Sequence, residues 1–257
     1  MKKSHSTISY HQISRTGSKT AQTNVAIEAT AILSINGVPW LTFQCTPDEL
    51  DALAIGYLYN QGLIKSLNDV ASLRVCDQQE NIDVWLYNPV TKSSSINRTT
   101  DCFNNLDSRD NDLEELEYAD VNFSLHPDDI FTLVDQFLTR QIPHSIAGGV
   151  HTTAIADGNN IVLELSDIGR HNSLDKIAGR ILLNNLVINK PVLLTTGRIS
   201  SEIVQKTVLL RSACLVSLRS ASQKGIILAD HYGITLISGA SRSRFNLLSH
   251  AERILIS

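Results

Sequence analysis

The alternation of apolar and polar positions in the first third of the chain predicts a small α+β unit. Two β runs lie within NVAIEATAILSINGVPWLTFQC and meet at Asn36-Gly37, a dipeptide typical of hairpin turns. A helical stretch, TPDELDALAIGYLYNQG, follows, and two more β runs, ASLRVCD and NIDVWLYN, complete the unit. We therefore expect an α+β domain over residues 25–88, preceded by a polar, flexible tail over residues 1–24.

Terminal signals predict where two helices begin. In TPDELDALAIGYLYNQG, Thr46 is the expected N-cap, Pro47 occupies the first helical position and Gly62 marks the end. In SLDKIAGRILLNNL the expected N-cap is Ser173. Each hydroxyl is expected to accept a hydrogen bond from a backbone N–H group of the first turn.

Short apolar runs alternate with helical patterns in residues 123–257. TTAIAD and NIVLELS predict a hairpin about Asp157-Gly158, whereas PVLLTTG, CLVSL and finally ITLISG predict buried strands. The helical patterns are HPDDIFTLVDQFLTRQ, SLDKIAGRILLNNL, SSEIVQKTVLLRSA and SQKGIILADHYG. This alternation is typical of a parallel or mixed sheet with helices on both faces. We expect an α/β protein whose C-terminal domain is a three-layer α/β/α unit.

A polar segment, residues 89–122, separates the two units. It contains few apolar side chains, and its second half is rich in Asp and Glu. We expect a mobile acidic loop with a short helix at DLEELEY. Because a loop of this length is usually functional or disordered, its one cysteine, Cys102, is of interest.

Composition and charge narrow the function classes. The chain has 257 residues, of which 42% are hydrophobic and 19% charged, as in ordinary soluble globular proteins. A formal net charge of −4 argues against a dedicated nucleic-acid-binding protein. No apolar run approaches the length of a membrane span, and the polar start does not resemble a secretory signal. We expect a cytoplasmic protein without nucleic-acid or membrane partners.

The four cysteines are scattered and form no CxxC pair, which argues against a structural zinc site. Cys45, Cys76 and Cys214 lie in apolar runs, where a cysteine usually behaves as a small hydrophobic residue. Cys102 has polar, loop-forming neighbours, so its thiol is expected to be accessible. Whether it is an incidental loop thiol or a reactive one stays open at this point, because a nucleophilic cysteine must also be partly ionised.

Three loops that follow predicted strands combine glycine with arginine: SDIGRHNSLDK, TTGRISSE and SGASRSRFN. In such sheets, ligands gather at the carboxyl ends of strands, where helix N-termini attract anions. The guanidinium groups of Arg170, Arg198, Arg242 and Arg244 are suited to phosphate. The sequence favours a phosphate-bearing ligand, although it contains no Walker A or GxGxxG motif. The alternative is that these arginines are solvated loop charges.

Histidines and acids crowd into the same region without the spacing of a metal site. His151 and His171 form no HxxxH or HxE motif, so we expect no metal and regard both as hydrogen-bonding groups that orient backbone or ligand. Asp175 and Lys176 follow one turn into the predicted helix. They are either part of the binding site or a capping and surface-charge feature.

The motifs GGVHTTA, SDIGRHNSLDKIAG, TTGRISSEIVQK and SRFN, in this order, resemble the FdhD family of formate dehydrogenase accessory sulfurtransferases. The resemblance covers about residues 25–250 and is densest over residues 147–206. It implies that a cysteine desulfurase passes persulfide sulfur to a loop cysteine. That cysteine delivers the sulfur to the molybdenum bis-molybdopterin guanine dinucleotide cofactor, which formate dehydrogenase needs in sulfurated form. It also implies a homodimer, and a C-terminal domain similar to the cytidine deaminase fold without its zinc.

Carried over residue by residue, the resemblance assigns a sulfur site and a cofactor site. The family's loop motif C-G-x-C-G falls on residues 102–106, where Cys102 is the expected catalytic cysteine and Asn105 replaces the second cysteine. Ser241 stands where an arginine is common, and Arg219 adds a charge. The expected cofactor-binding residues are Gly239, Ala240, Ser241, Arg242, Ser243, Arg244, Asn246, His151, Arg170, His171, Asn172, Asp175, Lys176, Gly197 and Arg198.

Two other functions compete with the sulfurtransferase. Because the second loop cysteine is missing, the chain is alternatively a non-catalytic carrier that binds the molybdenum cofactor and relays no sulfur. A zinc-dependent nucleoside deaminase would need a histidine and a cysteine pair as metal ligands, and we find no such triad in the sequence.

Overall fold

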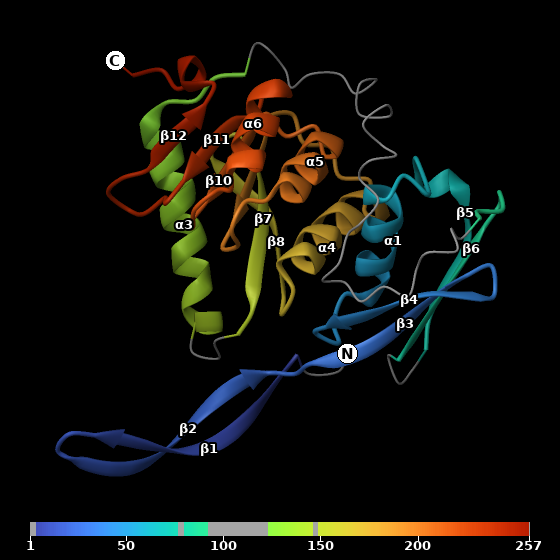
Figure 1. Ribbon diagram of the computed structural model, residues 1–257, viewed down its shortest axis with the longest axis horizontal. Coiled ribbons are helices and arrows are strands. Elements are labelled where there is room, and N and C mark those ends of the chain that lie inside the picture. The colour runs from blue at the N-terminus through green and yellow to red at the C-terminus, as the bar shows by residue number, and fades with distance from the viewer. Residues whose placement is uncertain (1–3, 77–79, 92–122, 146–148, 257) are drawn as a thin grey trace.

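The computed structural model describes residues 4–76, 80–91, 123–145 and 149–256. Over these residues it has five α-helices, a six-stranded and a four-stranded sheet, and a separate β-hairpin, which projects from the rest of the structure (Figure 1). The mixed α/β class predicted from the sequence is confirmed. Cys102 and the short helix predicted at DLEELEY lie outside the described residues. No helix in the described ranges is both long and apolar enough to cross a membrane.

The larger sheet has six strands in the order β12-β11-β10-β9-β7-β8. Strands β9, β10 and β11 are parallel, whereas β7 runs antiparallel to its neighbours β9 and β8, and β12 antiparallel to β11. The sequence did not predict β12, a four-residue edge strand in which only Ser249 is buried. Strands β10 and β11 are equally short, but all four residues of each are buried. The bounds are β7 (His151–Asp157), β8 (Asn160–Asp167), β9 (Pro191–Thr195), β10 (Cys214–Ser217), β11 (Thr235–Ser238) and β12 (Asn246–Ser249).

Helices cover both faces of this sheet. One face packs against α3 (Pro127–Ser145), and the other against α4 (Arg170–Leu183), α5 (Ser201–Leu209) and α6 (Gln223–His231). Successive residues of a strand point to opposite faces. Leu194 accordingly packs in the cluster that contains Phe137 of α3, and Leu193 packs with Ile177 of α4. The predicted three-layer α/β/α arrangement is confirmed, while its likeness to the cytidine deaminase fold stays a prediction.

The smaller sheet has four strands in the order β4-β3-β6-β5, with α1 (Leu50–Asn60) on its inner face. Asn36 and Gly37 both adopt positive φ, 50° and 78°, as the predicted hairpin turn requires. The strands are β3 (Ala29–Ile35), β4 (Val38–Cys45), β5 (Val70–Val75) and β6 (Asn81–Leu86), and the 3-10 turns are η1 (Leu67–Asp69) and η2 (Ala251–Arg253).

Helices α1 and α4 join the two units through glycines. A Cβ atom on Gly56 would lie 1.7 Å from the carbonyl oxygen of Asp175, and one on Gly179 would lie 1.9 Å from that of Ala52. No side chain fits at either position. The two helix backbones therefore touch, and the small unit is fixed directly behind α4.

Both predicted N-caps are wrong. Helix α1 begins at Leu50, four residues beyond Thr46, and α4 begins at Arg170, before Ser173. The Ser173 hydroxyl instead donates to the carbonyl oxygen of Arg170 inside the first turn. Thr46 bonds across the interface between the two units, so tertiary partners outweighed its local capping preference.

The structure forms a β-hairpin where the sequence analysis expects a flexible tail. Strands β1 (His5–Ser14) and β2 (Gly17–Ala26) pair antiparallel over ten residues each. Figure 1 shows this hairpin projecting from the small sheet. Its polar composition suggested a tail, but β1 contains Ile8, Tyr10 and Ile13, and β2 contains Thr20, Thr23 and Val25. These residue types favour extended backbone.

Candidate functional site

The predicted glycine- and arginine-bearing loops meet at one edge of the six-stranded sheet. Strands β8, β9, β10 and β11 all end at this edge, and the antiparallel strands β7 and β12 begin there. His151 consequently pairs with Asp167, the last residue of β8, and Thr195 pairs with Ser217. We call this the binding edge.

Positively charged side chains gather around His151 at the binding edge. Burial lowers the pKa of His151, and Arg170, Arg219, His171 and Arg198 lower it further through their positive charge. Arg198 and Arg219 are exposed, whereas Arg170, His151 and His171 are half-buried. The edge is therefore cationic and suited to an anion.

Arg170 lies against the loop that leads into α5. A Cβ atom on Gly197 would be 3.0 Å from Cβ of Arg170, so a larger residue would push the two apart by a few tenths of an ångström. The Nε atom of Arg170 and the hydroxyl of Ser200, the N-cap of α5, are buried without a hydrogen-bond partner among the described residues. Buried polar groups are normally satisfied. An anionic ligand at the α5 N-terminus would satisfy the Arg170 donor.

Hydrogen bonds tie the loops of the edge together. The Ser217 hydroxyl donates to the carbonyl oxygen of Gly197 (2.7 Å), and the Arg219 backbone N–H donates to the Ser217 hydroxyl (2.9 Å). The Gly239 N–H donates in turn to the carbonyl oxygen of Arg219 (2.9 Å). The backbone that presents Arg198, Arg219 and the last loop is thus held as one surface.

The last loop, residues 239–246, closes on itself. The Ser241 N–H and hydroxyl both donate to the carbonyl oxygen of Arg244, at 2.9 and 3.0 Å. Arg242 pairs with Asp135 of α3 (Nε to Oδ1, 2.7 Å), so its predicted phosphate contact competes with a carboxylate. Within the loop, the exposed residues are Arg242, Ser243, Arg244 and Asn246, whereas Ala240 is buried and Gly239 adopts a φ of 57°.

His171 is the outer end of a chain of polar and ionisable side chains that runs into the core. The Nδ1 atom of His171 lies 3.1 Å from Oε1 of Glu202. The same Glu202 oxygen lies 3.4 Å from Nζ of Lys206. Lys206 Nζ in turn donates to both carboxylate oxygens of Asp175, at 2.8 and 2.9 Å. The Asn60 side chain of α1 donates to Asp175 at 2.6 Å. Burial alone would lower the pKa of Lys206, but Asp175 and Glu202 outweigh it and raise that pKa. Burial opposes the ionisation of Glu202, yet Lys206 and His171 hold its pKa below the ordinary value.

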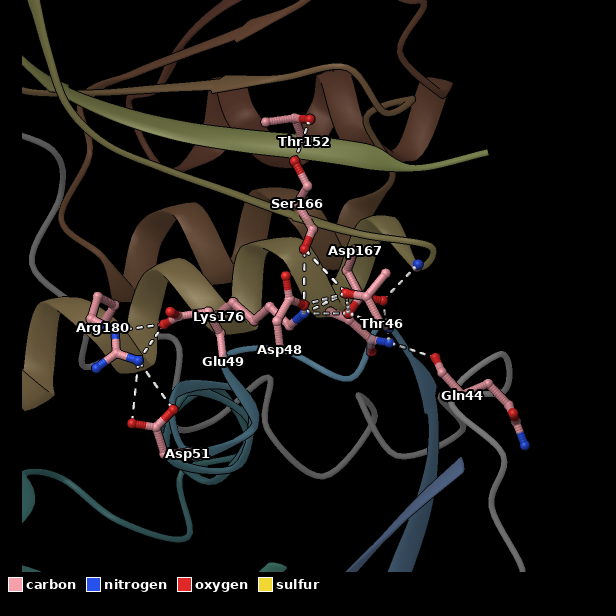
Figure 2. A network of polar contacts seen from close by, with 12 residues as sticks. Gln44, Thr46, Asp48, Glu49, Asp51, Thr152, Ser166, Asp167, Lys176 and Arg180 are labelled. Atoms are coloured by element: carbon pink, nitrogen blue, oxygen red, sulfur yellow. Dashed lines mark hydrogen bonds and ion pairs between the residues drawn. The ribbon is translucent and has the colours of Figure 1, made fainter. Parts of the chain in front are cut away.

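A second buried network surrounds Lys176 (Figure 2). Its Nζ donates to the Thr46 hydroxyl (2.7 Å) and to Asp48 (2.8 Å), and it pairs with Asp167 (2.7 Å). Asn172 donates to Asp167 and to the carbonyl oxygen of Gln44. This network joins β4 and the start of α1 to the end of β8.

The buried positions of Asn172, Asp175 and Lys176 correct two expectations. Their exposed fractions are 2%, 2% and 0%, and each bonds within the protein, so direct contact with a cofactor is contradicted. The alternative of a capping and surface-charge feature is wrong for Asp175 and Lys176 as well. Sequence reasoning missed the partners Glu202 and Lys206, although their i, i+4 spacing in a predicted helix was a visible signal.

Two of the described cysteines are poor nucleophiles. Cys45 and Cys214 are fully buried, and burial raises the pKa of each thiol to about 12. Cys76 is partly exposed, and its sulfur accepts hydrogen bonds from the N–H groups of Glu80 and Asn81, both at 3.2 Å. Over the described ranges, no three His, Cys, Asp or Glu side chains cluster so that they could hold a metal ion.

Comparisons with known proteins agree on one family. The family model described as FdhD/NarQ matches residues 26–255. A protein named sulfur carrier protein FdhD from Listeria monocytogenes is 30% identical, over 96% of this chain and 98% of its own length. A protein of the same name from Geobacillus kaustophilus is 28% identical, over 90% of each chain. A crystal structure from Desulfotalea psychrophila, whose description names a formate dehydrogenase accessory protein, matches with a TM-score of 0.80 and 25% identity, covering 98% of this chain and 99% of that one.

Proposed function

The chain belongs to the FdhD/NarQ family, and we propose that it is a sulfurtransferase that carries persulfide sulfur on Cys102 for the maturation of formate dehydrogenase. The sulfur would come from a cysteine desulfurase and go to the molybdenum bis-molybdopterin guanine dinucleotide cofactor. The names of the relatives support a sulfur carrier. The homodimer implied by the resemblance and the cytoplasmic location expected from the sequence are part of the proposal.

The first chemical step needs an accessible, ionised thiol. The Cys102 thiolate attacks the outer sulfur of the desulfurase persulfide, a new S–S bond forms on Cys102, and the desulfurase leaves with its own thiolate. Delivery of this sulfur as sulfide then takes two electrons, which a dithiol reductant can supply by becoming a disulfide. The deep burial and raised pKa of Cys45 and Cys214 support leaving this chemistry to the loop cysteine.

The binding edge supports the cofactor part of the proposal. The single observation that carries it is the buried Nε of Arg170, which has no hydrogen-bond partner among the described residues and belongs to a cationic cluster. The Arg170 side chain lies against Gly197, in the loop before α5. A pyrophosphate of the guanine dinucleotide supplies the oxygen acceptors that this donor lacks. The edge residues proposed to contact it are His151, Arg170, His171, Gly197, Arg198 and the loop 239–246, with Arg219 in addition.

Formate dehydrogenase activity in cells that depend on this protein tests the sulfur step. Cys102→Ala is expected to abolish activity, whereas Cys76→Ala, a matched loss of a partly exposed thiol, is expected to retain it. Retained activity in Cys102→Ala would contradict the proposal.

A non-catalytic carrier is the second candidate, because Asn105 stands where the family motif has its second cysteine. It predicts that Cys102→Ala leaves activity unchanged while substitutions at Arg170 reduce it. The sulfurtransferase predicts that both changes reduce it.

A further inference from the structure

Three strands of the large sheet, β8, β9 and β10, end in the same kind of turn at the binding edge. In each turn, the side chain of the last strand residue accepts a hydrogen bond from the backbone N–H group two residues later. The three bonds, with the donor first, are Gly169 to Asp167 (2.9 Å), Gly197 to Thr195 (3.0 Å) and Arg219 to Ser217 (2.9 Å). An arginine directly follows the first two turns, and the third turn ends on Arg219. Each turn therefore fixes the backbone from which an arginine side chain extends.

The Ser217 hydroxyl also bonds to the neighbouring turn. It donates its own proton to the carbonyl oxygen of Gly197 at 2.7 Å, because a hydroxyl can donate and accept at the same time. Ser217 is 0% exposed and pairs with Thr195 in the sheet, so water does not compete for this bond. One buried side chain thus joins the turn before Arg198 to the turn that ends on Arg219.

A backbone hydrogen bond joins the same two loops beyond the arginines. The N–H group of Ile199 donates to the carbonyl oxygen of Ser220 at 3.1 Å. This bond does not involve the Ser217 side chain. Loss of the Ser217 hydroxyl is therefore expected to loosen the spacing of the two loops without separating them.

The two arginines that these loops carry act on the same place. Arg198 and Arg219 both lower the pKa of His151 through their positive charge, so both guanidinium groups lie near one imidazole. Both side chains are exposed, and neither forms an ion pair within the part of the chain that the structure describes. Arg242, in contrast, is paired with Asp135. Arg198 and Arg219 are therefore suited to a ligand that carries two linked anionic groups.

A diphosphate is such a ligand, because its two phosphate groups share one oxygen. Strands β9 and β10 are direct neighbours, and adjacent strands lie about 4.8 Å apart, so their loops can contact the two phosphates together. A ligand that bridges two groups binds more tightly when the spacing of those groups is already fixed in the free protein. A single phosphate held by one arginine is not sensitive to that spacing.

We propose that Ser217 is a positioning residue that makes the binding edge selective for a diphosphate over a single phosphate. It touches no ligand and acts by holding the loops of Arg198 and Arg219 at a fixed spacing. The inference rests on the proposed function, since the diphosphate stands for the pyrophosphate of the cofactor.

Calorimetric titrations of the full chain with pyrophosphate and with inorganic phosphate test this selectivity. The wild-type chain is expected to bind pyrophosphate more tightly than phosphate. Ser217→Ala is expected to weaken pyrophosphate binding by about tenfold, the value of one hydrogen bond, and to leave phosphate binding nearly unchanged. Ser217→Cys, which retains a weaker donor and acceptor, is expected to lose less.

Ser212→Ala is the matched control for the loss of a buried hydroxyl. Ser212 is 1% exposed, and its hydroxyl donates to the carbonyl oxygens of Pro191 and Cys214, at 2.9 and 2.8 Å. These two residues begin β9 and β10, so the control removes hydrogen bonds from the opposite end of the same strands. Ser212→Ala is expected to bind both anions like the wild type, and unfolding midpoints show that each variant is folded.

A double-mutant cycle shows whether Ser217 acts through Arg219. Arg219→Met is expected to weaken pyrophosphate binding. Adding Ser217→Ala is expected to weaken it no further, because no pair of arginines then remains whose spacing matters. Fully additive losses would overturn the proposal.

Three other results would also overturn it: unchanged pyrophosphate binding in Ser217→Ala, equal weakening of both anions in that variant, or the same selective loss in Ser212→Ala. A wild-type chain that binds no pyrophosphate would overturn both this inference and the cofactor part of the proposed function. Tight wild-type binding that Ser217→Ala retains would overturn the inference alone.

Discussion

Replacing Lys206 with methionine removes the central charge of the buried chain that begins at His171. The Lys206 side chain is 3% exposed and bonds both oxygens of Asp175, which is itself 2% exposed. Methionine has a similar length, so the main change is the loss of the positive charge. Among the side chains that the structure describes, Asp175 then keeps only the Asn60 amide as a hydrogen-bond partner.

The expected loss of stability is large because a charge stays buried without its counter-ion. Removing one member of a buried ion pair costs about 3–5 kcal/mol. For a chain of this size, about 1 kcal/mol corresponds to roughly 2–4 °C, so the unfolding midpoint of Lys206→Met is expected to fall by about 6–20 °C. The double variant Lys206→Met/Asp175→Asn removes the stranded charge and retains an oxygen acceptor for Asn60. It is expected to be more stable than Lys206→Met alone.

Thermal and urea unfolding followed by circular dichroism measure both effects. Arg242→Met is the matched control, because its pair with Asp135 is solvent-exposed and is expected to contribute no more than about 1 kcal/mol. The reasoning is refuted if Lys206→Met loses no more stability than Arg242→Met. It is equally refuted if the double variant is less stable than Lys206→Met.

Three further predictions concern the helix contact and the binding edge. Gly56→Ala places a methyl group against the α4 backbone and is expected to lower the free energy of unfolding by about 1–3 kcal/mol or more. Urea unfolding measures this loss, and an unchanged midpoint would contradict the close contact between the two helices. Burial and the surrounding cations lower the pKa of His151, so its imidazole is mainly neutral near neutral pH. An anion bound beside it offsets the positive charge of the arginines and raises this pKa. Sulfate is therefore expected to bind more tightly at about pH 6 than at about pH 8 in calorimetric titrations, and the opposite trend would refute this assignment. Arg170→Met is expected to weaken guanosine diphosphate binding by roughly 10- to 100-fold, the value of a hydrogen bond to a charged group. Equal weakening in Arg74→Met, which changes an exposed arginine of β5 in the other sheet, would argue against a specific role for Arg170.

Most of the fold was predictable because its signals are local. The Asn36-Gly37 turn and the alternating strands of the large sheet follow from residue type and period. The start of α1 was not predictable in this way, because Thr46 forms hydrogen bonds with residues more than a hundred positions away in the sequence. The sequence analysis misjudged the β1–β2 hairpin because its regular pairing is not visible in its polar composition.

The sequence predicted at which edge of the sheet the site lies, but not which of its side chains are buried. Parallel strands carry their following loops to one edge, so the cationic cluster of Arg170, Arg198 and His151 could be expected. A motif does not indicate which of its side chains face inward. Asp175 and Lys176 are neighbours in the sequence, yet they belong to two different buried networks whose other members come from α1, β8 and α5.

Intact-protein mass spectrometry after incubation with a cysteine desulfurase and cysteine tests the central claim most directly. The account predicts that the chain gains the mass of one sulfur atom, that a reductant removes it, and that Cys102→Ala gains none while Cys76→Ala gains as much as the wild type. A gain that persists in Cys102→Ala, or a wild-type chain that takes up no sulfur, would contradict it.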